Sequence, residues 1–433
     1  MYRFNVSAPG TVFLCGEPKR RNQTCIAASL DMRTTLTFSS FPLSVVKIEF
    51  IGINFPSIQL DMRISLRQFY VHFYGENYKN WTSCVMLHEA VKNFITIMKD
   101  YEGTYKSNNQ THQLSLQAFF FLLILISQKE NIIITSTFMV KLSTELPIGE
   151  GLGSSASFAV CLAACFYRWS LLQKGIVVYE FGRQDLLKIS SYAQKCESTI
   201  YNSSTCIDIT ISTYGMIKIF DGGITSTLRA KSFSNIPYLK ILFFSNVDQK
   251  TKSEKSMKIA PVKNSDLLLN SILKSIEVMS STIVFMLDSI NLKVHNNLKN
   301  INGPLIDIIE DYKILMLRYT YFDIILLHDD DCLLEISVYR YTLEIVTIFD
   351  IIHMNQGLLK SLGMSHPNLD IISAIARKFL FAAKLAGKSE SRHGFILLPN
   401  ASAEDIDNLI TELKSYNFSA KITSLNCNGI RVE

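Results

Sequence analysis

The sequence predicts a globular protein that mixes strands and helices, and three features indicate this. The first half of the 433-residue chain is rich in short strand patterns, and the second half contains long helical tracts. Between them, a glycine-rich segment joins a strand-like run to an apolar, helix-like stretch. Hydrophobic residues make up 48% of the chain and charged residues 19%, so we expect two or three domains with full hydrophobic cores.

In the first half we expect strands over residues 6–14, 34–38, 45–50 and 132–142, and helices over residues 81–99 and 114–126. The second of these helices contains the apolar run Ala118–Ile126. Its nine residues are well short of the ~20 that a membrane-spanning helix needs. We therefore expect a buried core helix and no membrane association.

The pattern changes around Asp221–Gly223, where the second half begins. A strand is expected over residues 239–244, followed by long helices over 264–292, 304–317 and 333–360. The chain then returns to a strand, a helix and a strand over 394–398, 403–415 and 420–425. No internal repeat or low-complexity tract interrupts this order.

The glycine-rich segment Pro147–Ala156 is the most informative stretch, with the sequence Pro-Ile-Gly-Glu-Gly-Leu-Gly-Ser-Ser-Ala. Glycines let a backbone approach a phosphate, and the first N–H groups of the following helix point at it. Ser154 and Ser155 can cap that helix, and a hydroxyl here can also bind Mg²⁺. The segment is neither a Walker loop nor a dinucleotide-binding GxGxxG motif. The simpler alternative is a helix cap after an ordinary tight turn.

Several segments give this chain a family resemblance. Residues 145–156 resemble the central ATP-binding motif of the GHMP kinases, which phosphorylate galactose, homoserine, mevalonate and phosphomevalonate, and Val160–Ala164 narrows the resemblance to the mevalonate kinase branch. Residues 6–17 resemble the opening strand motif of the family, and residues 26–34 its second strand. Residues 354–363 and 366–370 resemble the helix–turn–helix before the third family motif. The resemblance therefore spans nearly the whole chain.

The resemblance implies a fold and a reaction. The implied fold is the α+β, two-domain GHMP kinase fold, with a ribosomal-protein-S5-like N-terminal domain over residues 1–225 and a ferredoxin-like C-terminal domain over residues 226–433. The implied activity is that of a mevalonate kinase, which uses ATP and Mg²⁺ to phosphorylate mevalonate for isoprenoid and sterol precursors. A phosphomevalonate or galactose kinase fits the Val160–Ala164 and 354–356 segments less well.

The resemblance also assigns residues to roles. The ATP-binding residues are expected to be Thr144, Gly149, Glu150, Gly151, Leu152, Gly153, Ser154 and Ser155. Glu197 and Asp208 lie eleven residues apart, a spacing that by itself is more typical of surface charges. In mevalonate kinases this spacing separates a Mg²⁺-binding glutamate from a catalytic aspartate. We therefore expect Asp208 to accept the proton, and Glu197 and Ser155 to supply the oxygen ligands of Mg²⁺.

The chain also departs from the family at the first and third motifs. The lysine that follows the first glycine is Thr11 here, and the histidine after Glu17 is Pro18. Four consecutive glycines of the third motif are replaced by Ser389–Arg392. Two readings stay open. One is an active kinase in which Lys388 or Arg392 supplies the missing cation, and the other is a catalytically impaired relative that binds a nucleotide or metabolite for a regulatory role.

Charge and cysteine content bear on partners and location. A net charge of +5 with no dense basic block gives no reason to expect nucleic-acid binding. Nine scattered cysteines without a CxxC pair are typical of reduced core thiols, and residues 1–6 lack the apolar run of a signal peptide. We expect a cytoplasmic protein whose partners are ATP and mevalonate. Similar proteins are often homodimers, which makes a homodimer a candidate assembly.

Overall fold

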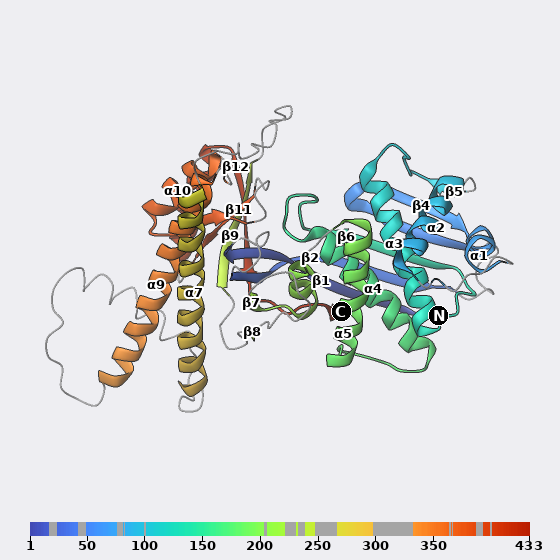
Figure 1. Ribbon diagram of the computed structural model, residues 1–433, viewed down its shortest axis with the longest axis horizontal. Coiled ribbons are helices and arrows are strands. Elements are labelled where there is room, and N and C mark those ends of the chain that lie inside the picture. The colour runs from blue at the N-terminus through green and yellow to red at the C-terminus, as the bar shows by residue number, and fades with distance from the viewer. Residues whose placement is uncertain are drawn as a thin grey trace. The chain divides into compact units, whose positions relative to one another are not determined.

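The computed structural model describes residues 1–16, 24–41, 49–75, 81, 83–98, 101–202, 206–220, 231–232, 239–246, 266–297, 332–362, 365, 367–386, 393–398 and 401–433. Within them the chain forms two compact units (Figure 1). Unit 1 comprises residues 1–12, 28–216 and 427–433, and unit 2 comprises residues 13–27 and 217–426. The domain boundary expected near residue 225 falls in 221–230, outside the described residues.

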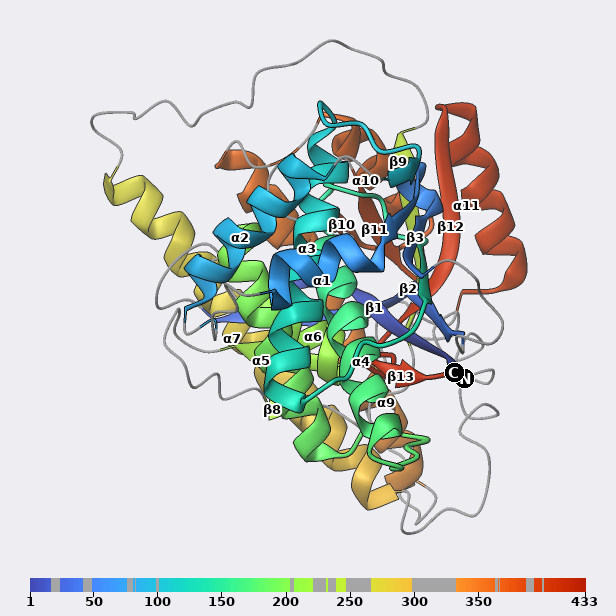
Figure 2. The ribbon, with the colours of Figure 1, turned by 90° about the vertical axis from the view of Figure 1, so that its right-hand side faces the viewer.

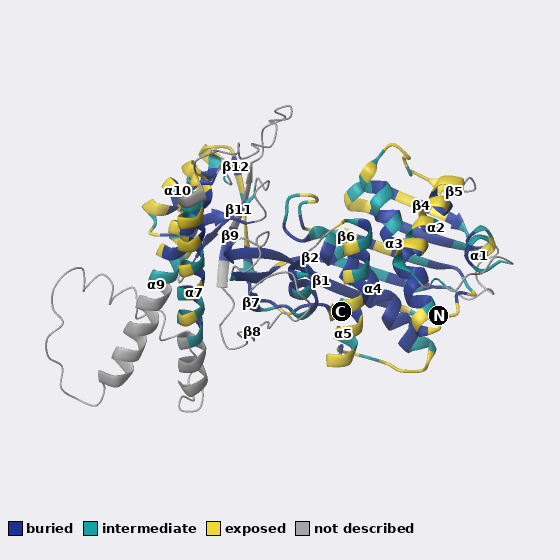
Figure 3. Cartoon of the chain, viewed as in Figure 1, coloured by how far each residue is buried: buried dark blue, intermediate teal, exposed yellow. Residues whose placement is uncertain are grey.

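The strands of unit 1 form a mixed sheet. They are β1 (Arg3–Cys15), β2 (Cys25–Ser40), β3 (Phe50–Phe55), β4 (Leu60–Ser65), β5 (Tyr101–Gly103), β6 (Phe138–Thr144) and β13 (Arg431–Val432). Strands β1 and β2 each contribute residues to both units. The sheet order is β2-β6-β3-β4-β5, in which only the β3–β6 pair is parallel among the described strands. Strand β1 pairs with β2 and with β13, and β1 and β2 are buried over most of their length (Figure 3).

The helices of unit 1 pack on this sheet. They are the 3₁₀ turn η1 (Pro56–Ile58) and the helices α1 (Leu66–Tyr74), α2 (Cys84–Ile97), α3 (Gln110–Glu130), α4 (Ser154–Gln173), α5 (Arg183–Ile200) and α6 (Ile207–Tyr214). A single core cluster joins apolar side chains of the strands to those of α1 to α5. Phe38 of β2, for example, stacks on Phe4 and Phe138 and contacts Trp169 of α4.

Helices α3 and α4 are the most apolar elements of the chain. Both are long and apolar enough to span a membrane, but 72% and 83% of their most apolar windows are buried inside the protein. The expected core helix is therefore confirmed, and it extends beyond 114–126. Asn109 begins α3 by accepting bonds from the N–H groups of Thr111 and His112, and Asn131 ends it in a left-handed conformation.

Unit 2 combines an antiparallel sheet with long helices. Its described strands are β7 (Ile217–Phe220), β8 (Lys231–Ser232), β9 (Leu239–Asn246), β10 (Ala383–Leu385), β11 (Gly394–Leu397) and β12 (Phe418–Leu425). Its described helices are α7 (Asp266–Asn297), α9 (Cys332–Ser361), α10 (Asn368–Lys378) and α11 (Ala403–Ser415). The sheet order is β10-β11-β9-β12. Helix α11 lies beside β12 (Figure 2), and its apolar side chains complete the core with α10.

Most of the predicted elements are present with small differences in their ends. The strand predicted over 132–142 is shorter, because residues 132–137 connect α3 to β6 and bury Ile132 and Ile134 without pairing as a strand. Of the strand predicted over 45–50, residues 45–48 lie outside the described residues, and β3 begins at Phe50. The helix predicted over 304–317 also lies outside them.

Candidate active site

The segment between β6 and α4 is a loop whose shape depends on glycine. Gly149, Gly151 and Gly153 have φ angles of +82°, +77° and +72°, in the left-handed region. A residue with a side chain is disfavoured there by roughly 1–2 kcal/mol. The alternating glycines therefore set the path of the backbone into the helix.

The glycine loop leads directly into the N-terminus of α4, where the first backbone N–H groups have no partner within the helix. Gly153 occupies the N-cap position, so the predicted serine cap is wrong, and Ser154 and Ser155 already belong to the first turn. The N–H of Ser157 donates to the carbonyl of Gly153 at 2.9 Å, which is the bond that begins the helix. The three N–H groups before it stand at the positive end of a 20-residue helix. This arrangement is suited to an anion such as a phosphate.

The opening strand β1 holds the loop in place. The N–H of Thr11 donates to the carbonyl of Leu152 at 3.0 Å, and the Leu152 side chain is fully buried. A methyl group on Gly10 would lie 2.4 Å from the Leu146 side chain and 3.1 Å from the Leu152 carbonyl. A side chain at position 10 would therefore have to displace Leu146 and press on the Leu152 carbonyl, because the loop lies directly against the strand.

Thr144 and Glu150 occupy the start and the middle of the loop region. The Thr144 hydroxyl accepts a bond from Thr34 at 2.9 Å and one from the N–H of Leu146 at 3.1 Å. Thr144 thus fixes the point where the chain leaves β6. Glu150 lies between the first two left-handed glycines and is half-buried.

A buried carboxylate, Glu130, binds the start of α5, the helix that carries Glu197, together with two half-exposed lysines. The Glu130 carboxylate accepts bonds from Tyr192 at 2.7 Å and Lys188 at 3.0 Å, and Lys174 lies 3.5 Å away. Burial alone would raise the pKa of Glu130, but the bonds from Tyr192 and Lys188 hold it below its ordinary value. Glu197 itself follows in the last turn of α5 with 6% of its surface exposed.

Asp208 lies in the first turn of α6 and is 7% exposed. One turn later, the Ser212 hydroxyl donates to the Pro9 carbonyl at 2.9 Å. Residues four apart share one face of a helix, so Asp208 and Ser212 both face β1. The Ser157 hydroxyl of α4 donates to the neighbouring Ala8 carbonyl at 3.0 Å. Strand β1 is therefore held between the start of α4 and α6.

The expected site residues are thus carried by one packed group of elements in unit 1. Helices α4, α5 and α6 pack against one another, and each holds part of the expected machinery. The two carboxylates are buried, and burial together with Cys196 and Glu197 raises the pKa of Tyr201 well above its ordinary value. Within the described residues no three His, Cys, Asp or Glu side chains gather as a metal site. Ser155 lies on the first turn of α4 and Glu197 on the last turn of α5, and these two helices pack against each other.

Thr11 stands where the family resemblance would place a lysine. Its side chain is fully buried, and its hydroxyl has no hydrogen-bond partner among the described residues. A methyl group on Gly153 would lie 3.0 Å from this hydroxyl. The space at position 11 is therefore closed by the N-cap of α4.

The altered third motif begins in unit 2. Lys384 of β10 is buried and donates to the Phe13 carbonyl at 2.9 Å, and the N–H of Leu385 donates to the Gln356 side chain at 3.0 Å. The interpretation of Lys388 and Arg392 as substitute cations falls on residues 387–392, outside the described residues. Glu17 and Pro18 are outside them as well.

Comparison with known proteins finds similarity to GHMP kinases. Residues 121–216 match the family described as GHMP kinases N terminal domain. The mevalonate kinase of Bos taurus is 26% identical over 99% of this chain and 94% of its own, and that of Arabidopsis thaliana is 23% identical over 98% of each. Among solved structures, the Methanococcus jannaschii mevalonate kinase superposes with a TM-score of 0.54 at 15% identity, covering 98% of both chains. The chain has the GHMP kinase fold.

The matched GHMP domain contains the glycine loop, Glu197 and Asp208. A putative sugar kinase from Campylobacter jejuni shares the fold with a TM-score of 0.56 at 12% identity. Sequence reasoning did not identify Ser157 and Ser212, which fasten this GHMP domain to β1. Their partners are 149 and 203 residues away in the chain, and a lone serine on a helix carries no signal of that contact.

Proposed function

We propose that this chain is a mevalonate kinase, which transfers the γ-phosphoryl group of ATP to the 5-hydroxyl of mevalonate. The product, 5-phosphomevalonate, is a precursor of isoprenoids and sterols. The observation that carries the proposal is the similarity to mevalonate kinases over nearly the full chain, combined with a glycine loop and two buried carboxylates in the matched domain.

The glycine loop is the proposed ATP site. Its left-handed glycines let the backbone approach the phosphates, and the first N–H groups of α4 donate to their oxygens. The residues we assign to this role are Thr144, Gly149, Glu150, Gly151, Leu152, Gly153, Ser154 and Ser155. Thr144 and Leu152 act by fixing the loop at its two ends.

Mg²⁺ is the proposed metal partner of ATP. When bound, Mg²⁺ neutralises the charge that develops on the phosphates. Ser155 on the first turn of α4 and Glu197 on the last turn of α5 would hold it.

Asp208 is the proposed proton acceptor. A carboxylate near the substrate hydroxyl accepts its proton, or orients it, as the new O–P bond forms. Asp208 is suited to this because α6 holds it on a face turned toward β1, beside the start of α4.

A second candidate is a catalytically impaired relative that binds a nucleotide or metabolite for a regulatory role. The enclosed Thr11 favours it, because a neutral hydroxyl replaces a cation expected near the transferred group. Loss of one such electrostatic contact reduces turnover by about 10²–10³. The phosphate cradle, which we define as the glycine loop 149–153 and the first N–H groups of α4, would still bind ATP.

An assay of purified protein with ATP, Mg²⁺ and mevalonate, coupled to ADP release, separates the two candidates. Mevalonate-dependent ADP release that disappears in Asp208→Asn would support the kinase. ATP binding without any mevalonate-dependent turnover would contradict it and favour the impaired relative. Parallel assays with galactose and phosphomevalonate test the choice of acceptor.

We further propose that residues 1–225 and 226–433 act as the two domains of the kinase. A cytoplasmic location and a homodimer complete the proposal. Fractionation of cells and light scattering of the purified protein test these two points.

A further inference from the structure

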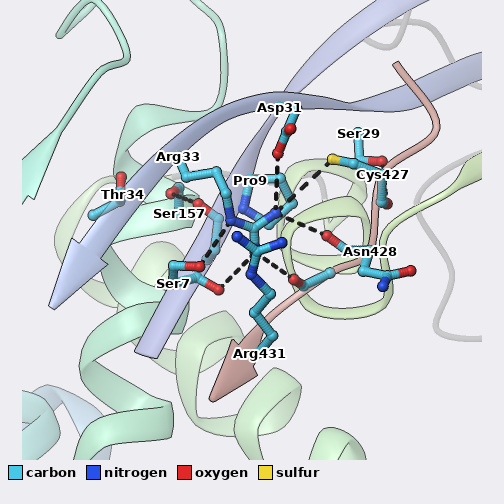
Figure 4. A network of polar contacts seen from close by, with 12 residues as sticks. Ser7, Pro9, Ser29, Asp31, Arg33, Thr34, Ser157, Cys427, Asn428 and Arg431 are labelled. Atoms are coloured by element: carbon cyan, nitrogen blue, oxygen red, sulfur yellow. Dashed lines mark hydrogen bonds and ion pairs between the residues drawn. The ribbon is translucent and has the colours of Figure 1, made fainter. Parts of the chain in front are cut away.

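Arg33 of β2 is a buried cation that bonds mainly to neutral groups. Only 7% of its side chain is exposed, and Asp31 lies 3.7 Å away (Figure 4). Its Nε and Nη2 donate to the side chain and carbonyl of Ser7, both at 2.8 Å. Nη2 also donates to the Gly429 carbonyl at 2.7 Å, and Nη1 to the Asn428 carbonyl at 3.0 Å. Burial lowers the pKa of the Arg33 guanidinium. The planar guanidinium nevertheless donates to the backbone carbonyls of two separate segments at once.

The first of these segments is the part of β1 that supports α6. Ser7 lies two residues before Pro9, whose carbonyl accepts the Ser212 hydroxyl. Ser7 also donates to the Glu433 side chain at 2.6 Å, and it pairs with Arg431 of β13. Arg33 therefore fixes β1 at the point where α6 is fastened.

The second segment, 427–430, encloses the other end of α6. Asn428 forms a β-bridge with Gly215, and the N–H of Ile430 donates to the Thr213 carbonyl at 3.1 Å. A methyl group on Gly429 would lie only 2.1 Å from the Thr213 carbonyl oxygen. The fit leaves no space for a side chain between this segment and the helix.

We propose that Arg33 and residues 427–430 form a positioning device for Asp208. This inference rests on the proposed role of Asp208. Helix α6 has only eight residues, so its placement is set by what holds it, and one guanidinium fixes both supports. Proper placement matters because a shift of about 1 Å in a reacting group can reduce a rate ~10²-fold.

The sharpest test is Gly429→Ala, which adds one methyl group against α6. Gly429 is outside the left-handed region, so alanine is compatible with its backbone, and the contact with Thr213 is the main perturbation. We expect kcat to fall at least ~tenfold while the KM for ATP changes less than about twofold, because the phosphate cradle lies on α4. Amide hydrogen exchange within α6 should accelerate at least ~tenfold relative to α4.

Two further variants complete the experiment. Arg33→Lys keeps the charge but loses the fork, so we expect the same changes as in Gly429→Ala, and an intact fold is checked by exchange in α3. Gly357→Ala on α9 is the matched control, because nothing lies within 4 Å of the added methyl group. It should leave both kcat and α6 exchange unchanged.

The hydrogen-exchange arm separates this inference from the proposed function. If the wild-type protein shows no turnover, the kinase proposal fails, and faster exchange confined to α6 in the two variants still supports the positioning device. Unchanged α6 exchange in both variants overturns it whatever the turnover. Equal loss of protection across α3, α4 and α6 overturns it too, because Arg33 would then act on the whole unit.

Discussion

The glycine loop and the opening strand β1 meet at the N-terminus of α4, and they offer different things to an anion. The loop offers backbone N–H groups, shaped by three left-handed glycines. The strand supports this loop. Gly10 lets the loop lie directly against β1, and the N–H of Thr11 donates to the Leu152 carbonyl. At the position where the resemblance would place a lysine, it offers only an enclosed hydroxyl.

This difference separates binding from chemistry. Backbone donors at a helix N-terminus bind phosphate in the ground state. A lysine near the transferred group acts mainly on the charge that develops during transfer. A chain that keeps the first and lacks the second should bind ATP well and react slowly.

Asp208→Asn should have the largest effect. The amide removes the proposed proton acceptor while keeping the shape of the side chain, so we expect kcat to fall about 10²–10⁴-fold. Binding of ATP, measured by calorimetry, should stay within about twofold because the loop is untouched. Retention of more than roughly a tenth of wild-type turnover would remove Asp208 from the mechanism.

Gly153→Ala tests the loop side of the comparison. The alanine would be strained at φ +72° and would lie 3.0 Å from the Thr11 hydroxyl. We expect ATP affinity to fall about tenfold, because the N-cap must shift and carry the N–H groups with it. Gly175→Ala is the matched control, with φ +76° and nothing within 4 Å of the new methyl group. If both variants lose ATP affinity equally, general strain and not the cradle is responsible.

The sequence could predict the backbone side of this site because its signals are local. Alternating glycines between a strand and an apolar helix indicate the loop, and the amphipathic pattern over 403–415 indicates α11 at its observed bounds. The apolar run indicates α3 as a core helix, although α3 extends beyond the predicted 114–126 at both ends. The serine cap was wrong because Gly153, one residue earlier, already takes the left-handed cap position. Local propensity does not distinguish these adjacent choices.

The contacts that place the site could not be predicted, because they join distant residues. Arg33 bonds to Gly429, 396 residues away, and Ser29 donates to the Cys427 carbonyl, 398 residues away. A buried arginine in a strand carries no sequence sign of which carbonyls it will satisfy. The burial of the Thr11 side chain could not be predicted either, because it depends on the close approach of Gly153, which is distant in the sequence.

Ser155→Ala and Glu197→Gln should have a moderate effect on the metal requirement. Each change weakens one proposed oxygen ligand, so the Mg²⁺ concentration for half-maximal activity should rise about three- to tenfold in each. Titration of Mg²⁺ at saturating ATP measures this, with Ser198→Ala on the exposed side of α5 as the control. Unchanged half-saturation in both variants would contradict the metal assignment.

Thr11→Val should have the smallest effect and tests the strand side of the comparison. Valine keeps the branched shape and removes a buried hydroxyl that has no partner within the described part of the chain. Removing such a group should raise the free energy of unfolding by about 1 kcal/mol, which thermal unfolding measures as a rise of a few degrees in Tm. Thr213→Val is the matched variant, because its hydroxyl is also buried without a partner among the described residues and lies on α6.

If the Thr11 side chain only fills space between β1 and α4, Thr11→Val should gain stability and keep its kcat within about twofold. A tenfold or greater fall in kcat with unchanged ATP affinity would instead show that the hydroxyl takes part in phosphoryl transfer, and the contrast between loop and strand would fail.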